Sequence, residues 1–466
     1  LGALQDNGGT VMTRNIESSA SPLVNAGSNA AAAGLATDAN GNVRISDGTV
    51  DIGATEFDGP LVVTTELDVV DASDGLLSLR EAVTIANGDG NGDLIKFDAT
   101  LAGKTIVLTS QLQITSDVTL DGDVNDDFKA DITLSGGNAN GILRATSAGT
   151  DLNVRSLTLT NGAAVYGGAI YAGGGGTLQV SHSTISNSSG SSFGGGIFSF
   201  VNTYVTNSTF FGNSAGNGGG GGIYSRYGYV VLMNTTVHDN STTGLGGGVK
   251  SGFGDLLLIN STVAGNQADS DGAQVNAGGG IALVSNTLYI RNSVVATNTS
   301  GMGNAAHDVG GAVSSAGNSF FGTTVTIATD FGGNINTGGD PLLGELLDNG
   351  GTVLTMSPLD NSPLIGKGSN VFLPFDVFDV DGDDDTTEIL PLDGRGGVRI
   401  LLGTVDIGAV EQFPAELIRG TAGNNTIIGG LGADILFGLE GDDTITGGAA
   451  NDYVEGGAGA DTLDGG

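Results

Sequence analysis

The strongest constraint on the fold is a repeat of about 26 residues that places Gly, Asn and short β-branched runs at fixed positions. The apolar residue after each Gly-rich turn is Ile170, Ile197, Ile223, Val249 or Ile281. Gly and Asn favour turns, and alternating apolar residues favour strands with one buried face. One such repeat cannot bury its own apolar face. The pattern therefore predicts coils, over about residues 95–340, that stack around one continuous core.

Two sets of Asn residues accompany these coils. The first set is Asn161, Asn187, Asn213, Asn240, Asn266 and Asn298. The second set opens the pattern N-[ST]-[TV] at Asn207, Asn234, Asn260 and Asn292. Apolar residues precede each of these by two positions, at Val205, Leu232, Leu258 and Ile290, and follow by three, at Phe210, Val237, Val263 and Val295. We expect the Asn side chains to stack as amide ladders between coils and not to act as ligands.

A second repeat joins distant parts of the chain. Residues 1–29 are similar to 343–370, and residues 48–56 are similar to 403–411. We expect residues 1–57 to be the C-terminal end of a preceding β-helix module. Residues 61–413 would then be a complete module, closed by residues 343–413, which we call the closing block.

These segments carry a family resemblance. Residues 76–83, LLSLREAV, resemble the opening of CSLREA-type β-helix domains, with Leu77 where that family has Cys. The closing block resembles the choice-of-anchor tail of large secreted bacterial proteins. The coils resemble the pectin-lyase-like superfamily, which implies an all-β, right-handed parallel β-helix.

The tail has a period of nine residues from Gly420 onward. Its sixth position is Asn425, Asp434, Asp443, Asp452 or Asp461, and its eighth is Ile427, Leu436, Ile445, Val454 or Leu463. The unit resembles the RTX (hemolysin-type) nonapeptide, so residues 418–466 should form a short parallel β-roll that binds Ca²⁺. Glycines allow the turns and Asp supplies hard oxygen ligands, so we expect metal binding to be coupled to folding.

Two further acidic runs are candidates for calcium. Residues 376–388 contain Asp379, Asp381 and Asp383 at alternate positions, and residues 121–131 are similar. Both resemble the start of an EF-hand loop but lack its later Gly and Glu. Each run either binds calcium or is a solvated acidic loop.

The charge limits the partners. The chain has 15 Lys and Arg against 51 Asp and Glu, a net charge of −36, which argues against nucleic acid and anionic membranes. No apolar run is long enough to span a membrane. With no Cys, disulfides and Cys-ligated metals are excluded. The RTX resemblance implies type 1 secretion, to the extracellular space or the bacterial cell surface.

We assign no catalytic residue. His182 occupies an Asn position, and His238 and His307 lie at turns. The best constellation is Arg226 and Lys250, which strand alternation places outward on adjacent coils.

An outward column is also predicted, consisting of Tyr171, Phe198, Tyr224, Lys250 and Ala282, with Phe200 beside it. The column either binds sugar rings or another protein, or is a flank covered by a loop.

The leading hypothesis is a secreted, calcium-binding, non-catalytic stalk, adhesin or fibre subunit. The alternatives are a polysaccharide lyase or epimerase acting on acidic glycans, and a carbohydrate-binding module. Uncapped solenoid ends would expose strand edges and core, so we expect end-to-end association or continuation into further covalent modules.

Overall fold

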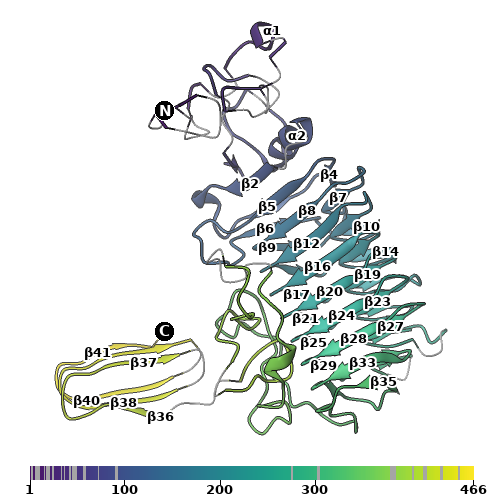
Figure 1. Ribbon diagram of the computed structural model, residues 1–466, viewed down its shortest axis with the longest axis vertical. Helices are drawn as coiled ribbons and strands as arrows, with labels where there is room; N and C mark the ends of the chain where they lie inside the picture. The colour runs from purple at the N-terminus through teal and green to yellow at the C-terminus, as the bar shows by residue number, and fades with distance from the viewer. Residues whose placement is uncertain are drawn as a thin grey trace.

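The computed structural model describes residues 93–465 apart from 274–276, 302–304, 378–384, 401–402, 413–416, 431–433 and 450–451. Before residue 93 it describes residues 1, 4–5, 11–14, 16, 21–23, 26–32, 34–35, 37–40, 44, 50–55, 59–71 and 73–89. The predicted architecture is confirmed: a right-handed parallel β-helix is followed by a short parallel roll (Figure 1).

Four sheets, numbered I to IV, surround the β-helix core. Sheet I has 11 strands: β1 (Leu61–Val63), β2 (Asp93–Phe97), β5 (Val118–Asp121), β8 (Leu152–Arg155), β12 (Thr177–Ser181), β16 (Asn202–Thr206), β20 (Val230–Met233), β24 (Leu256–Ile259), β28 (Leu288–Arg291), β33 (Val313–Gly317) and β35 (Ile327–Asp330). Sheet II has 9 strands: β3 (Thr105–Val107), β6 (Ile132–Ser135), β9 (Leu157–Thr160), β13 (Thr184–Ser186), β17 (Thr209–Phe211), β21 (Thr236–His238), β25 (Thr262–Ala264), β29 (Val294–Ala296) and β34 (Phe320–Phe321).

From β9 to β29, each coil continues from sheet II through sheet III to sheet IV, whereas the coils of β3 and β6 pass directly from sheet II to sheet IV. Sheet III has 7 strands: β10 (Ala163–Tyr166), β14 (Ser189–Phe193), β18 (Ser214–Ala215), β22 (Ser241–Thr242), β26 (Gln267–Ala268), β30 (Thr299–Ser300) and β31 (Ala305–Ala306). Sheet IV has 8 strands: β4 (Leu112–Ile114), β7 (Leu143–Ala145), β11 (Ile170–Ala172), β15 (Ile197–Ser199), β19 (Ile223–Ser225), β23 (Val249–Ser251), β27 (Ile281–Leu283) and β32 (Val309–Gly310). The pairing is parallel throughout the named strands of the β-helix, except that β30 and β31 are antiparallel.

The core consists of apolar columns that run in register from coil to coil. The predicted column of Ile170, Ile197, Ile223, Val249 and Ile281 pairs residue by residue in sheet IV. Its members are fully buried. The columns through Val205 in sheet I and Phe210 in sheet II are likewise paired as predicted. Stacking therefore buries the face that one coil would leave in water.

The predicted amide ladder exists, but it has four Asn members in place of six. Asn213, Asn240, Asn266 and Asn298 are fully buried, and each side-chain amide bonds the next at 2.9 Å. Asn161 and Asn187 lie one position earlier in their coils, where the backbone is left-handed, with φ of 55° and 50°. Asn tolerates that conformation, so both residues make the turn and not the ladder.

The second Asn set forms the corner between sheets I and II. Asn207, Asn234, Asn260 and Asn292 all have positive φ, and so does His182 in the preceding coil. Asn207 Nδ2 lies 3.1 Å from His182 Nε2, and Asn234 Nδ2 donates to Asn207 Oδ1. His182 is therefore a variant of the Asn position, as predicted.

The expectation of an uncapped end is wrong for the start of the β-helix, because helix α2 (Leu79–Asp89) covers it. Leu79, Ala82 and Ala86 are fully buried in the main core. Ser78 N donates to Glu81 Oε2 and Glu81 N donates to Ser78 Oγ, a capping box that starts the helix. The segment that resembles the CSLREA motif is thus the cap of the solenoid.

The closing block lies along sheet II (Figure 1). Thr209 Oγ1 donates to Leu354 O, and Asn234 Nδ2 donates to Leu392 O. Gly408 N donates to Asn292 O at 2.8 Å. The described part of the block has little regular structure beyond η2 (Asn370–Phe372). It therefore adheres to the coils mainly through loops, and the module boundaries drawn from the sequence remain predictions.

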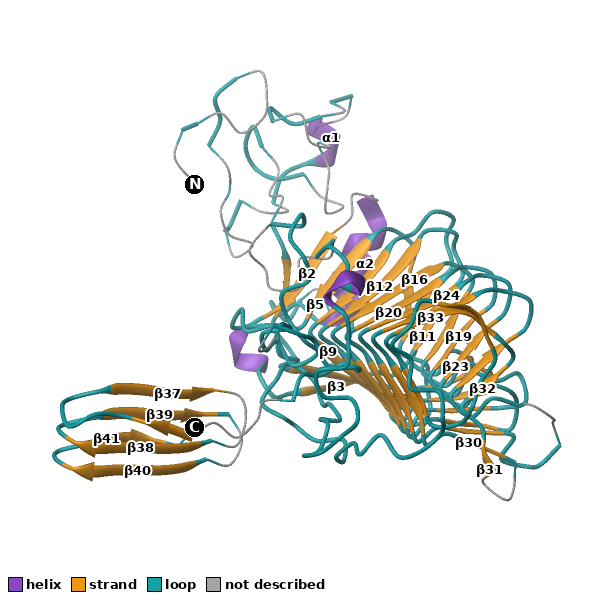
Figure 2. Cartoon of the chain, turned by 60° about the horizontal axis from the view of Figure 1, so that its bottom comes forward, coloured by secondary structure: helices purple, strands orange, loops and turns teal. Residues whose placement is uncertain are grey.

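The C-terminal roll consists of two sheets of three parallel strands (Figure 2). One contains β36 (Leu417–Arg419), β38 (Ile435–Glu440) and β40 (Tyr453–Ala458), and the other contains β37 (Thr426–Gly430), β39 (Thr444–Gly448) and β41 (Thr462–Asp464). Ile427, Leu436 and Ile445 form its small buried core. The remaining short helices are α1 (Asn29–Ala32) and η1 (Ala99–Leu101). Among the described residues, no helix is both long and apolar enough to cross a membrane.

Candidate functional site

The position-six residues of the roll form two stacked rows, in which the carboxylates of Asp443, Asp452 and Asp461 each accept from the backbone N–H of the residue 18 positions earlier. Asp443 Oδ1 accepts from Asn425 N at 2.7 Å. Asp452 Oδ1 accepts from Asp434 N, and Asp461 Oδ1 accepts from Asp443 N. One oxygen of each carboxylate therefore holds the turn, and the geometry repeats with the period read from the sequence.

The second carboxylate oxygens are the chemically informative ones. Asp443 Oδ2 and Asp452 Oδ2 are buried and have no hydrogen-bond partner. A methyl group placed on Gly438 would overlap both Asp443 Oδ2 and the carbonyl oxygen of Gly456. Glycine thus leaves a space where carboxylate and carbonyl oxygens converge. Hard oxygen donors of this kind suit Ca²⁺, so the residues present fit the ion.

Three units of the roll depart from the consensus in sequence: the first, the third and the fourth. Asn425 takes the place of Asp in the first unit, where its Oδ1 accepts from Thr421 N. Leu439 takes the place of the second Gly in the third unit and is held at φ 84°. A left-handed conformation costs a residue with a Cβ about 1–2 kcal/mol, so Leu439 is a strained position in the roll.

The other two acidic runs give weaker evidence for a calcium site. Asp379, Asp381 and Asp383 lie outside the described residues. In the 121–131 turn, one carboxylate oxygen each of Asp123, Asp127 and Asp131 lie within 4.8 Å of one another. The Asp123 carboxylate already accepts from three backbone amides of its own turn. These bonds explain the turn without a metal ion, and calcium binding there remains a prediction.

The outward column of sheet IV is mostly buried, which corrects the expectation of an exposed row. Phe198, Tyr224 and Lys250 are 2%, 7% and 8% exposed. The ring of Phe193, from sheet III, packs on Phe198 and Tyr224 at 5.5 Å. The alternative of a covered flank is therefore the better description of these residues. Tyr171 is half-buried beneath Arg144, whose guanidinium carbon lies 4.2 Å from the ring centre.

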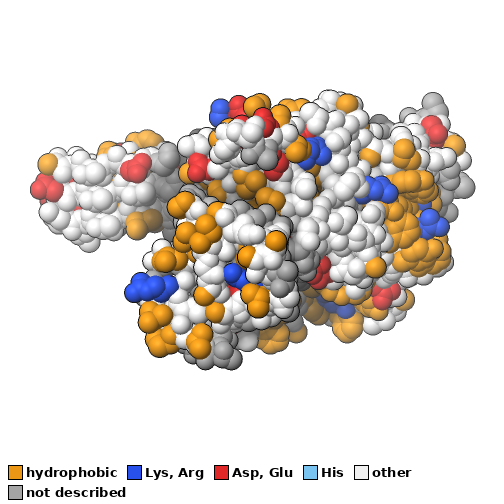
Figure 3. Space-filling model, turned by 90° about the horizontal axis from the view of Figure 1, so that it is seen from above, with side chains coloured by type: hydrophobic (Ala, Val, Ile, Leu, Met, Phe, Trp, Pro, Cys, Tyr) orange, Lys and Arg blue, Asp and Glu red, His pale blue; other side chains and the backbone are white. Residues whose placement is uncertain are grey.

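Exposed rings lie beside that column instead. Phe200, Tyr227 and Phe253 contact one another in sequence, and Tyr227 and Phe253 are 53% and 55% exposed. Hydrophobic side chains gather with Lys and Arg on this side of the β-helix (Figure 3). The coil spacing of these three residues is visible in the sequence, but the predicted column included only Phe200 of the three.

The Arg226 and Lys250 pair does not form an exposed basic site. Lys250 Nζ donates to Gly218 O and lies 4.8 Å from the centre of the Tyr224 ring. Burial lowers the pKa of Lys250. Arg226 is half-buried over Phe200 and Tyr227. The two cations therefore contact different rings, with Lys250 buried against Tyr224 and Arg226 over Phe200 and Tyr227.

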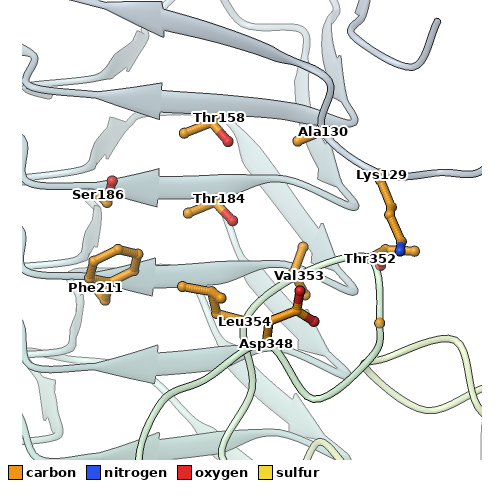
Figure 4. Close-up of a pocket in the computed structure, with 11 residues that line it drawn as sticks. Lys129, Ala130, Thr158, Thr184, Ser186, Phe211, Asp348, Thr352, Val353 and Leu354 are labelled. Carbon is orange, nitrogen blue, oxygen red and sulfur yellow. The ribbon is translucent and has the colours of Figure 1, made fainter. Parts of the chain in front are cut away.

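Sequence reasoning missed a groove between the closing block and sheet II. It encloses about 340 Å³, and Figure 4 shows Thr158, Thr184 and Ser186 on the strands behind the loop that carries Asp348 and Thr352. A second hollow of about 550 Å³ adjoins it, since both include Phe211 and Leu354. His238, Asp239 and Glu345 line this second hollow. Both hollows form where the closing block packs against sheet II, a long-range contact that no local sequence pattern predicts.

Comparison with known proteins agrees with the roll. Residues 415–445 and 437–466 match the model of the RTX calcium-binding nonapeptide repeat (4 copies). No curated protein matches the chain. Among solved structures, the chain is similar to pectate lyase Pel9A, with 12% identity and a TM-score of 0.39 over 76% of this chain and 97% of that one. The stacked parallel sheets of its own fold make the chain a parallel β-helix protein. Its C-terminal part consists of RTX repeats, which bind calcium.

Proposed function

We propose that this chain is a secreted, calcium-binding structural or adhesive protein, a β-helical stalk or fibre subunit without catalytic activity. RTX repeats are typical of secreted bacterial proteins, which supports an extracellular or cell-surface location. The observation that carries the proposal is the pair of buried, unpartnered oxygens, Asp443 Oδ2 and Asp452 Oδ2. Buried carboxylates destabilise a fold unless a cation or donor compensates them. The roll is therefore built to be completed by calcium.

The proposed ligands are the carboxylates of Asp434, Asp443, Asp452 and Asp461, the amide oxygen of Asn425 and nearby glycine carbonyls. The bound ion supplies the positive charge that these oxygens lack. Cytosolic calcium is too low to fill such sites, so the roll would fold after export, and this timing fits a secreted protein.

A calcium titration of the full chain, followed by circular dichroism, tests this part. We expect β signal to increase as calcium reaches millimolar concentration, and the increase to be lost in Asp443→Asn/Asp452→Asn. Glu440→Gln removes an exposed acid of the same roll outside position six, and it should titrate like the natural chain. An unchanged spectrum in the natural chain would refute the proposal.

The absence of catalysis is tested separately. The calcium-loaded chain is incubated with alginate and with pectate, and the absorbance of unsaturated uronate products is followed. The structural role predicts no product above a buffer control. Product formation would instead favour the lyase alternative, and the groove beside His238 and Glu345 would be the first place to mutate.

One observation favours a second function, carbohydrate binding by the exposed rings. Tyr227 and Phe253 are stacked 5.5 Å apart, and the Arg226 guanidinium lies 5.5 Å from the Tyr227 ring centre. Aromatic rings pack against the apolar faces of sugars, and Arg binds carboxylates, so an acidic glycan fits this surface.

Binding to a glycan array tests it. Tyr227→Ala/Phe253→Ala should abolish binding to acidic glycans. Phe331→Ala is the matched control, because Phe331 is 57% exposed and likewise lies beneath an arginine, Arg291, but packs against Phe372. Equal loss in both variants, or no binding by the natural chain, would exclude this second function.

A further inference from the structure

One of the attachments of the closing block to the coils is a short loop, which we call the seated loop (residues 406–409). Ile407 is fully buried in an apolar cluster with Val294, Phe320 and Leu364. Gly408 N donates to Asn292 O at 2.8 Å, and Ala409 N donates to Thr262 Oγ1 at 3.1 Å. The loop therefore binds two successive coils. It contacts the corner Asn292 of one coil and Thr262, which lies just after the corner Asn of the preceding coil.

Residues 51–54, which we call the bare loop, have the same sequence pattern and the same internal hydrogen bonds. Ile52 N donates to Leu23 O, as Ile407 N donates to Leu364 O. Three further hydrogen bonds have a counterpart in each loop. Around the bare loop they join Gly27 N to Val50 O, Ala39 N to Ala54 O, and Arg44 Nη2 to Gly53 O. Around the seated loop they join Gly368 N to Val405 O, Gly394 N to Ala409 O, and Arg399 Nη2 to Gly408 O. The two loops are therefore built on the same local framework.

The surroundings of the two loops differ. Ile52 is 50% exposed, whereas Ile407 is fully buried. Gly53 and Gly408 both have positive φ, 144° and 125°. A Cβ on Gly408 would lie 3.1 Å from Thr262 Oγ1, whereas one on Gly53 would have no described atom within 4 Å. The bare loop is formed for docking but has no docking surface against it among the described residues.

We propose that the bare loop binds the flank of another parallel β-helix with the N-[ST]-[TV] corner. The seated loop defines the surface required: a corner Asn carbonyl, a Thr hydroxyl one coil earlier, and an apolar hollow for Ile. The equivalent flank of this chain is occupied by its own closing block, so the partner is a β-helix whose flank is free. This proposal deepens the structural role by naming the partner of one end of the chain.

A variant of this chain whose closing block is detached provides such a partner, because its own flank is then free. Ile407→Asp places a charge in the buried hollow and frees the flank, so copies of this variant should associate head to tail through their bare loops. Analytical ultracentrifugation should show a monomeric natural chain and dimers or larger species for the variant. Ile52→Asp/Ile407→Asp should return to monomer. Leu35→Asp/Ile407→Asp should remain associated, because Leu35 is equally exposed but lies outside the loop.

Monomeric Ile407→Asp, or equal association with and without Ile52→Asp, would overturn the proposal. The assay reads neither calcium binding nor catalysis, so its failure would be distinct from failure of the proposed function.

If Ile407→Asp does not fold, a chimera gives the answer. Residues 38–56 replace residues 393–411, which have the same length. If residues 38–56 can bind the flank, the chimera should show a cooperative thermal transition close to that of the natural chain. Loss of the transition would count against the proposal.

Discussion

Asn298 Nδ2 donates a hydrogen bond of 3.0 Å to Asp308 Oδ1, and this carboxylate ends the buried amide ladder. Asp308 also accepts from Asn298 N through Oδ1 and from Thr323 Oγ1 through Oδ2. Every earlier step of the ladder joins two neutral amides, whereas this one buries a charge with no cation among its hydrogen-bond partners. Burial raises the pKa of Asp308, and the hydrogen bonds from Asn298 and Thr323 only partly oppose the increase.

Asp308→Asn should therefore stabilise the β-helix at neutral pH. Because the pKa of Asp308 in the folded state is raised above 3.8, the stability that this residue contributes is fully present below pH 3.8. That stability is lost as the pH rises through the folded-state pKa. The variant keeps an acceptor for Asn298 and removes the buried charge. The difference in melting temperature between the variant and the natural chain should grow from pH 4 to pH 7, and a constant difference would contradict this account.

Asn266→Ala should destabilise the β-helix by about 1–3 kcal/mol, because it removes the Oδ1 that accepts from the buried backbone N–H of Asn240 and the Nδ2 that donates to Val237 O. Denaturant unfolding measures the change. Asn217→Ala is the control, since Asn217 is exposed beside the same coils, and it should be within about 0.5 kcal/mol of the natural chain. Similar losses in both variants would show that the ladder has no special role.

Arg80→Ala should unfold the cap. Arg80 Nε and Nη2 both donate to Asp68, whose side chain is fully buried, so the variant leaves a buried charge and costs about 3–5 kcal/mol. Lys104→Ala removes the half-exposed pair with Glu66 and should cost less than about 1 kcal/mol. Hydrogen exchange at α2 would locate the effect, and equal protection in both variants would refute it.

Leu439→Gly should strengthen the roll. The change relieves the positive φ of Leu439 and should lower the calcium concentration at the midpoint of folding, by an amount equivalent to about 1 kcal/mol. Glu440→Gly is the matched control, because the neighbouring residue does not have positive φ and gains only chain flexibility. A midpoint that moves upward in both variants would argue against strain at Leu439.

Much of the fold could be predicted because one coil constrains the next. The columns through Ile170, Val205 and Phe210 were read from spacing alone, and they pair as expected. The ladder was misassigned by one position at Asn161 and Asn187. Asn is favoured both for the left-handed turn and for the adjacent ladder, and spacing near 26 residues does not distinguish two neighbouring positions.

Other features were missed for different reasons. The capping box at Ser78 and Glu81 was present in the sequence, but the helix it starts was not predicted. The groove lined by Thr158 and Asp348 could not be inferred, because the closing block meets the coils through backbone carbonyls such as Leu354 O and Leu392 O. Any residue can supply a carbonyl, so such contacts leave no pattern in side chains.

The way the closing block bridges successive coils has a mechanical consequence. Its bonds extend from Thr209 to Asn318, across coils that are otherwise held to one another by parallel ladders. Tension along the rod would peel an unsupported coil from its neighbour a few bonds at a time. Where the closing block lies along the coils, the same tension must break its hydrogen bonds to several coils at once. The block therefore acts as a splint. The rod would then yield first in the coils before Thr209, and the splinted half would transmit the load intact.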